Sequence, residues 1–182
     1  MPIVDDHEVS LRPIERRDLE MLNRWKNDEE TYRYLGGGYA PTSVDIQEGW
    51  LESLMDMGGS SRRFIIEHSD IGSVGMIGLY DINWVHRTCD LGIFLGEKAA
   101  RGHGVASRAY LLIEAYAHRY LNLRKIKASV VSDHASAVNM YERLGFRHAG
   151  TLYAERFIDG AYRDLMLMEK FVDESNKVSQ HA

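Results

Sequence analysis

The segment Cys89–Tyr120 constrains the fold of this chain most, because it predicts a strand, a glycine turn and a long helix in succession. The apolar run Leu91–Leu95 has the length and composition of a strand. Apolar residues then recur at helical spacing from Ala106 to Leu121, which is typical of an amphipathic helix. The chain must therefore turn sharply between these two elements, at Arg101–Ala106 (RGHGVA).

The turn at residues 101–106 has the properties of an anion-binding loop. Gly102 and Gly104 allow a tight turn and let a ligand approach where a Cβ atom would clash. The first amides of the following helix have no partner within the helix and carry a partial positive charge, which suits phosphate oxygens. Arg101 adds a cation that can bind phosphate with two hydrogen bonds. The turn therefore predicts a pyrophosphate site. A glycine turn that merely precedes a surface helix would have the same sequence. The spacing of the two glycines matches neither the Rossmann fingerprint nor the P-loop.

Composition limits the classes of function. The 182 residues are 45% hydrophobic and 27% charged, which predicts a single domain over residues 1–171 and a disordered tail at 172–182. A net charge of −5 without clusters of Lys or Arg argues against nucleic acid as a partner. One cysteine excludes an internal disulfide and favours a reducing compartment. Since no apolar run reaches membrane-spanning length and the N-terminus is too acidic for a signal peptide, we expect a cytoplasmic protein without a membrane partner, and a homo-oligomer is compatible with the sequence.

Periodicity and turn residues predict the other elements. The expected strands are residues 8–14, 63–67, 73–81, 124–131, 146–157 and 162–171, and the expected helices are 15–27, 43–57 and 135–144. The strand at 8–14 is expected at an edge because of Pro13, and residues 28–41 are expected to form a mobile loop. Thr42 or Ser43 is expected to cap the helix at 43–57, Asp133 to cap the last helix and Gly145 to end it. The pair Asp159-Gly160 predicts a two-residue hairpin.

A second motif, Tyr141–Phe146 (YERLGF), lies one strand and one helix after the glycine turn. With Arg101-x-x-Gly104-x-Ala106 after a strand, it resembles the GNAT superfamily of acetyl-coenzyme A-dependent N-acetyltransferases over residues 9–171. The segments RWKND (24–28), HR (86–87) and FIDGAYRD (157–164) resemble one branch of that superfamily. This branch holds the ribosomal-protein N-terminal acetyltransferases and the spermidine acetyltransferases.

The resemblance implies an α+β fold with a mostly antiparallel sheet of six or seven strands, splayed at its central strands and surrounded by about four helices. It also implies acetyl-coenzyme A (acetyl-CoA) as cosubstrate and no metal, with the pantetheine arm in the splay and the pyrophosphate on the loop amides. The implied cofactor-binding residues are Phe94, Leu95, Arg101, Gly102, His103, Gly104, Val105, Ala106 and His134. His134 stands where the family often has an asparagine, and an imidazole N–H can donate the same hydrogen bond.

The resemblance further implies that Tyr141 is the general acid of the reaction. In direct transfer an amine attacks the thioester carbonyl, and the departing thiolate needs a proton. A phenol with a pKa near 10 is protonated at neutral pH and has a basicity comparable to that of a thiolate. The amine must first lose a proton, for which Asp90 and His86 are candidate bases and a water chain is the alternative. Cys89 is not expected to act as a nucleophile, and the histidines show no metal-ligand spacing.

The sequence does not identify the amine that accepts the acetyl group. Candidate wall residues of the amine pocket are Trp25, Tyr32, Tyr80, Trp84 and Phe157, each of which would also suit the core or its rim. In the family that this chain resembles, spermidine acetyltransferases carry a glutamate-rich segment, suited to a polycation, in the region of residues 31–43. This chain reads TYRYLGGGYAPTS there, without an acidic residue, which argues against a polyamine as acceptor. A peptide or protein N-terminus, a small amine, an amino sugar and an amine antibiotic stay as alternatives, as does an acyl group other than acetyl. A non-catalytic module that binds acetyl-CoA or a partner chain is the competing class, and the presence of Tyr141 with both loop glycines argues against it.

Overall fold

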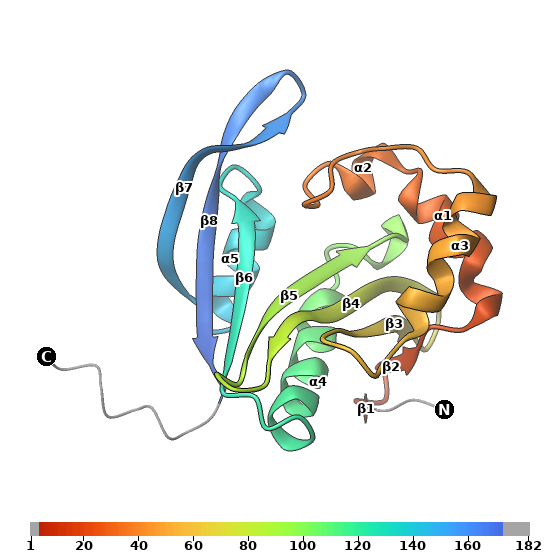
Figure 1. The fold of residues 1–182 in the computed structure, drawn as a ribbon, viewed down its shortest axis with the longest axis horizontal. Helices are drawn as coiled ribbons and strands as arrows, with labels where there is room; N and C mark the ends of the chain where they lie inside the picture. Colours follow the sequence, from red (N-terminus) through yellow and green to blue (C-terminus); the bar gives the residue numbers. More distant parts are fainter. Residues whose placement is uncertain (1–3, 173–182) are drawn as a thin grey trace, which may run out of the picture.

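The computed structural model describes residues 4–172, which form one eight-stranded sheet with helices on both faces (Figure 1). The strand order is β1-β2-β3-β4-β5-β6-β8-β7, and every neighbouring pair is antiparallel except β5 and β6. The strands are β1 (Val4–Asp5), β2 (Val9–Pro13), β3 (Arg62–His68), β4 (Gly72–Asn83), β5 (Thr88–Leu95), β6 (Lys125–Val131), β7 (Arg147–Ile158) and β8 (Ala161–Phe171). The helices are α1 (Leu19–Lys26), α2 (Glu29–Tyr32), α3 (Val44–Met55), α4 (Val105–Arg119) and α5 (Ala135–Arg143), with 3-10 turns η1 (Arg16–Asp18) and η2 (Lys98–Ala100). The α+β class and the mostly antiparallel sheet are confirmed.

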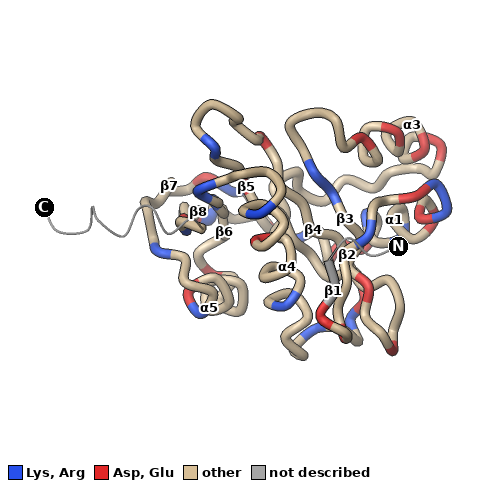
Figure 2. Tube along the Cα trace, turned by 90° about the horizontal axis from the view of Figure 1, so that it is seen from below, with Lys and Arg blue, Asp and Glu red and all other residues tan. Residues whose placement is uncertain are grey.

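Each face of the sheet carries its own core. Phe64 and Ile66 of β3 belong to the core that includes α4 and α5, whereas Ile65 between them belongs to the core that includes α1 and α3. These two pairs of helices lie on opposite sides of the strands (Figure 2). All three side chains are at most 1% exposed. A strand buried on both faces reads as a continuous apolar run, which is why this stretch (RRFIIEH) lacks the alternation of a half-exposed strand.

The sheet opens between β5 and β6. The two strands pair only from Thr88 opposite Lys125 to Leu91 opposite Ala128. Beyond this point β5 stays with β4 up to Leu95, and β6 stays with β8 up to Val131. The sheet therefore divides into two arms, which diverge in Figure 1 on either side of the opening. The residues of β5 and β6 that flank the opening keep one unpaired backbone edge each within the described sheet.

Several local predictions are confirmed. Ser43 caps α3 by accepting a hydrogen bond from the amide of Ile46 at 3.3 Å. Gly145 follows α5 with a φ of +88°, as a left-handed helix terminator should. Asp159 and Gly160 both have positive φ in the turn between β7 and β8, which matches the twist of a hairpin.

Other local predictions are wrong, each because a contact distant in sequence overrides the local signal. The strand with Pro13 is not at the edge, because β1 pairs with it through Val4 opposite Leu11. His134, and not Asp133, is the N-cap of α5; Asp133 instead forms an ion pair with Arg163 of β8 at 3.4 Å. The expected loop at residues 28–41 contains the short helix α2. The tail expected to be disordered, residues 172–182, lies outside the described part of the chain from residue 173 on.

The helix expected at residues 15–27 starts with the 3-10 turn η1, and α1 begins only after Asp18, which belongs to a buried ion pair. The carboxylate of Asp18 accepts two hydrogen bonds from Arg12 of β2, at 2.7 and 2.8 Å, and one from the amide of Glu15 at 2.8 Å. Arg12 also donates to Glu67 of β3 at 2.7 Å and to Ser73 of β4 at 3.1 Å. One guanidinium thereby joins three strands to the turn that precedes α1.

Candidate active site

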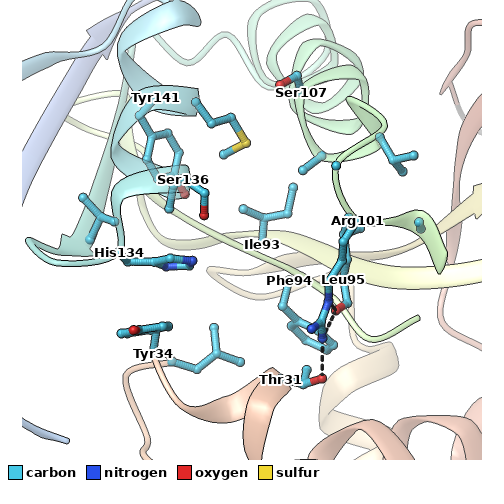
Figure 3. Close-up of a pocket in the computed structure, with 18 of the residues that line it drawn as sticks. Thr31, Tyr34, Ile93, Phe94, Leu95, Arg101, Ser107, His134, Ser136 and Tyr141 are labelled. Carbon is cyan, nitrogen blue, oxygen red and sulfur yellow. Dashed lines mark hydrogen bonds between the residues drawn. The ribbon is translucent and has the colours of Figure 1, made fainter. Parts of the chain in front are cut away.

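A cavity of about 550 Å³ lies where the two arms of the sheet separate (Figure 3). Its walls come from the open end of β5, the start of α4, the end of β6, one face of α5 and the segment around α2. The lining residues are Ile93, Phe94 and Leu95; Ala100, Arg101, Gly102, Gly104, Val105, Ala106 and Ser107; Ser129, Val130 and Val131; His134, Ser136, Ala137, Met140, Tyr141 and Arg143; and Glu30, Thr31, Tyr34 and Leu35. The site thus joins segments that are more than a hundred residues apart in sequence.

The glycine turn before α4 borders this cavity with free backbone. Gly102 has a φ of +80° and Gly104 a φ of +77°, and a Cβ atom built on either would meet no atom within 4 Å. Gly104 is the N-cap of α4, and no side chain caps this end of the helix. The first intrahelical bond runs from the amide of Arg108 to the Gly104 carbonyl, so the amides of residues 105–107 stay available to a ligand. A 15-residue helix adds its positive end to the same place.

Arg101 is anchored beside the turn and does not point freely into the cavity. Its guanidinium donates two hydrogen bonds to the carbonyl of Leu95, at 3.2 and 3.0 Å, and one to the Thr31 hydroxyl at 3.0 Å (Figure 3). It also forms an ion pair with Glu30 at 2.6 Å. Arg101 therefore ties the open end of β5 to α2, and its charge is balanced by a carboxylate on the cavity wall.

Tyr141 projects from α5 toward the same cavity (Figure 3). Its side chain is 6% exposed and packs edge-on against Phe146, with the ring centroids 5.1 Å apart. Burial raises the pKa of its phenol well above the ordinary value. Tyr141 consequently stays protonated at neutral pH, as a general acid must and a general base must not.

His134 stands at the first turn of α5 and closes one side of the cavity. Its ring stacks on that of Tyr34, with centroids 4.3 Å apart and an angle of 14° between the planes (Figure 3). Burial lowers the pKa of His134, against the smaller opposite effect of Asp133. The imidazole is therefore neutral at neutral pH and offers one N–H donor and one acceptor nitrogen.

The two candidate bases lie away from the cavity lining. Asp90 holds Lys127 in an ion pair at 2.9 Å and precedes Phe94 by about 13 Å along the extended strand. His86 lies in the turn before β5, beyond Thr88, which is about 23 Å from Leu95 along the strand. Cys89 is buried, and burial together with Asp90 raises the pKa of its thiol to about 12, so this thiol is unreactive.

The five aromatic residues suggested for the amine pocket are spread over the molecule. Trp25 is 2% exposed in the core between α1 and α3, and its indole N–H donates to Glu97 at 2.9 Å. Trp25 and Tyr32 both pack against the ring of the lining residue Phe94, with centroids 6.0 and 5.6 Å away. Tyr80 lies on β4 near Arg63, whereas Trp84 and Phe157 are 49% and 65% exposed. Neither these five residues nor His103 belong to the cavity lining.

Sequence reasoning missed several lining residues. Ser136, Met140 and Arg143 are spaced four and three residues apart and so share a face of α5 with one another, but helical spacing counted from Tyr141 leads only to the lining residue Ala137. Tyr34 and Glu30 carry no such signal, because only the tertiary fold brings α2 and the residues after it to the cavity.

Comparisons with known proteins agree with this geometry. The family model described as an acetyltransferase (GNAT) domain matches residues 8–147. The spermidine N(1)-acetyltransferase of Escherichia coli K12 is 33% identical over 162 residues, covering 89% of this chain and 85% of that protein. The putative ribosomal N-acetyltransferase YdaF of Bacillus subtilis is 24% identical over 170 residues, covering 90% of each chain.

Solved structures are similar throughout the fold. The spermidine N-acetyltransferase of Vibrio cholerae, crystallised in complex with CoA and spermine, superimposes with a TM-score of 0.83 at 28% identity, over 91% of this chain and 96% of that one. No helix within residues 4–172 has the length and apolar character needed to cross a membrane. The chain belongs to the GNAT family and is an N-acetyltransferase that moves an acetyl group from acetyl-CoA to a primary amine.

Proposed function

We propose that the cavity at the sheet opening binds acetyl-CoA and that the amine of a small molecule attacks the thioester there directly, with Tyr141 as general acid. The observation that carries this proposal is the placement of a protonated, buried phenol in the same cavity as an open strand edge and an uncapped helix start. A module that only bound a ligand would have no need of a proton donor at this position.

The chain offers a partner for each part of the cosubstrate. The unpaired edge of β5 near Phe94 and Leu95 can bind the amide groups of an extended arm as an added strand would. The amides after Gly104 suit the pyrophosphate, and Arg143 supplies a cation on the opposite wall. His134 can donate one hydrogen bond to the arm as a neutral imidazole.

Tyr141 gives its phenolic proton to the leaving thiolate when the tetrahedral intermediate collapses to amide and thiol. General-acid help of this kind contributes about 10²–10⁴-fold to rates. The proton of the substrate ammonium leaves through water, because Asp90 is held by Lys127 and His86 lies at the far end of β5. The nitrogen is cationic after the attack and loses its second proton to water as the amide forms, and the resulting phenolate is reprotonated from solvent.

The test is release of free thiol from acetyl-CoA in the presence of a panel of amines. The panel contains spermidine, an amino sugar, an aminoglycoside and peptides with a free N-terminus, and the acetylated product is identified by mass spectrometry. We expect amine-dependent thiol release. Binding of acetyl-CoA without turnover on any amine would instead support the non-catalytic module.

Gly104→Val should raise the KM for acetyl-CoA at least tenfold, about 1.4 kcal/mol, because a branched side chain would occupy the space next to the amides that bind phosphate. The valine also strains a backbone with a φ of +77°. Gly72→Val is the matched control, since Gly72 has a φ of +85°, has equally open space around it and is the first residue of β4, directly after the turn from β3. Calorimetric titration with CoA should show weaker binding for Gly104→Val alone; equal affinities in the two folded variants would show that the turn does not bind phosphate.

A further inference from the structure

The hairpin of β7 and β8, at the far edge of the sheet, contains an irregularity. The pairing register shifts between Leu152 and Arg156, and Ala154 inside this bulge has a φ of +51°. The side chain of Asp164 on β8 stabilises the bulge by accepting a hydrogen bond from the Ala154 amide at 2.8 Å. Bulges beside active sites commonly redirect a side chain. Here the residue after the bulge is Arg156.

Arg156 reaches from β7 to the segment that follows α2. One of its terminal nitrogens donates to the carbonyl of Gly36 at 2.8 Å. A Cβ atom on Gly36 would lie 3.3 Å from the other terminal nitrogen, so the guanidinium fits closely under this segment. Figure 1 shows the hairpin and the segment between α2 and α3 facing each other across the opening of the sheet.

The guanidinium of Arg156 is incompletely satisfied. Its Nε atom is buried and has no hydrogen-bond partner among residues 4–172, and no carboxylate in that part of the chain forms an ion pair with it. The neighbouring arginines differ, because Arg163, directly opposite on β8, pairs with Asp133, and Arg33 pairs with Asp159. A buried donor on a charged group without a partner is costly and calls for a missing acceptor.

The guanidinium lies close to the part of the cavity wall that is formed by the residues after α2. Gly36 directly follows Leu35, and both Leu35 and Tyr34 line the cavity. The segment 31–43 that faces Arg156 contains no acidic residue. Arg156 therefore contacts the residue next to two lining residues, and its guanidinium forms no ion pair with a carboxylate of residues 4–172.

We propose that Arg156 binds an oxyanion, a carboxylate or a phosphate, carried by the same molecule as the acceptor amine. The planar fork of a guanidinium suits either group. The proposal rests on the proposed acetyltransferase function and narrows its acceptor to amines that bear an anionic group. A polycation such as spermidine would bring more positive charge to this arginine.

The first test compares matched pairs of acceptors by thiol release at saturating acetyl-CoA. The pairs are ω-amino acids of increasing chain length against alkylamines of the same length, a dipeptide against its C-terminal amide, and glucosamine 6-phosphate against glucosamine. We expect the anionic member of at least one pair to have a kcat/KM at least tenfold higher, and the chain-length series to show one preferred spacing. The carboxylate and phosphate pairs distinguish the two sources of the oxyanion.

The second test changes the arginine. Arg156→Gln retains an N–H donor for the Gly36 carbonyl but removes the charge, and should raise the KM of the anionic acceptor at least tenfold while leaving its uncharged analogue within about twofold. Arg163→Gln is the matched control, because it removes a charge from the opposite position on the hairpin that Asp133 already neutralises. Calorimetry with CoA checks that cosubstrate binding is equal in both variants.

The outcomes separate the two proposals. If uncharged amines or spermidine are the better acceptors in the wild type, or if Arg156→Gln affects both members of a pair equally, the oxyanion site is wrong and the acetyltransferase function stands. If no amine on either panel is acetylated, both proposals fail.

Discussion

Tyr141→Phe should lower kcat about 100-fold with little change in the KM for acetyl-CoA. The substitution removes one hydroxyl and almost no volume, so the edge-on packing against Phe146 survives. The hydrogen bond to the thiolate grows only as the carbon–sulfur bond breaks, and its loss therefore affects the transition state and not the ground state. Steady-state kinetics on a confirmed acceptor measures both constants.

The pH profile adds a second signature of Tyr141. Because burial raises its pKa, the acid stays protonated through the alkaline range in which an ordinary phenol would ionise near pH 10. The wild-type kcat should therefore show no fall near pH 10 that results from ionisation of Tyr141. Tyr110→Phe is the control, since Tyr110 is another buried tyrosine that packs on Phe146, at 5.3 Å between centroids, without lining the cavity. Equal kcat values in wild type and Tyr141→Phe would leave Tyr141 as a packing residue and water as the acid.

Asp18→Ala should lower the free energy of unfolding by about 3–5 kcal/mol, because it leaves the charge of Arg12 buried without its main partner. Both side chains of this ion pair are about 5% exposed. Urea unfolding at neutral pH measures the loss. Glu67→Ala is the matched control: it removes the other carboxylate on Arg12, but that side chain is 37% exposed, so the loss should be no more than about 1 kcal/mol.

The same ion pair makes the stability depend on pH. Burial alone would raise the pKa of Asp18, but the hydrogen bonds from Arg12 and the Glu15 amide outweigh it, and the net pKa is lowered. A carboxyl group whose pKa is lower in the folded protein contributes its stability above the ordinary Asp pKa, near 3.8, and loses it as the pH falls through the folded value. The difference between wild type and Asp18→Ala should therefore shrink below about pH 4. A difference that stayed constant down to pH 2 would contradict this account.

Residues whose roles depend on local backbone could be predicted from sequence. Gly145 adopts the positive φ expected after the end of a helix, Gly104 lies in the tight turn expected before α4, and Asp159-Gly160 forms the expected hairpin turn. Each of these signals lies within a few residues along the chain. Gly104 and Tyr141 were expected in one site because their motifs resemble those of the GNAT superfamily, and both line the cavity.

Residues whose roles depend on distant partners could not be predicted in this way. Asp18 lay inside an expected helix, and only its ion pair with Arg12 explains why that helix begins later. Tyr34 lines the cavity because it stacks on His134, a hundred positions further along the chain. Arg156 looks like any surface arginine of a hairpin until the bulge before it and the Gly36 carbonyl in front of it are known.

The short ladder between β5 and β6 has a consequence for hydrogen exchange. Since only residues 88–91 and 125–128 pair across the division of the sheet, the amides on the open edges beyond them have no ladder partner to slow their exchange with solvent. A cosubstrate bound along that edge would supply the missing acceptors. Deuterium uptake in residues 92–95 and 129–131 should therefore slow on binding, whereas uptake in β3, which is buried on both faces of the sheet, should not change. At the opening between the two arms, the ligand and not the fold would then protect the backbone amides from hydrogen exchange.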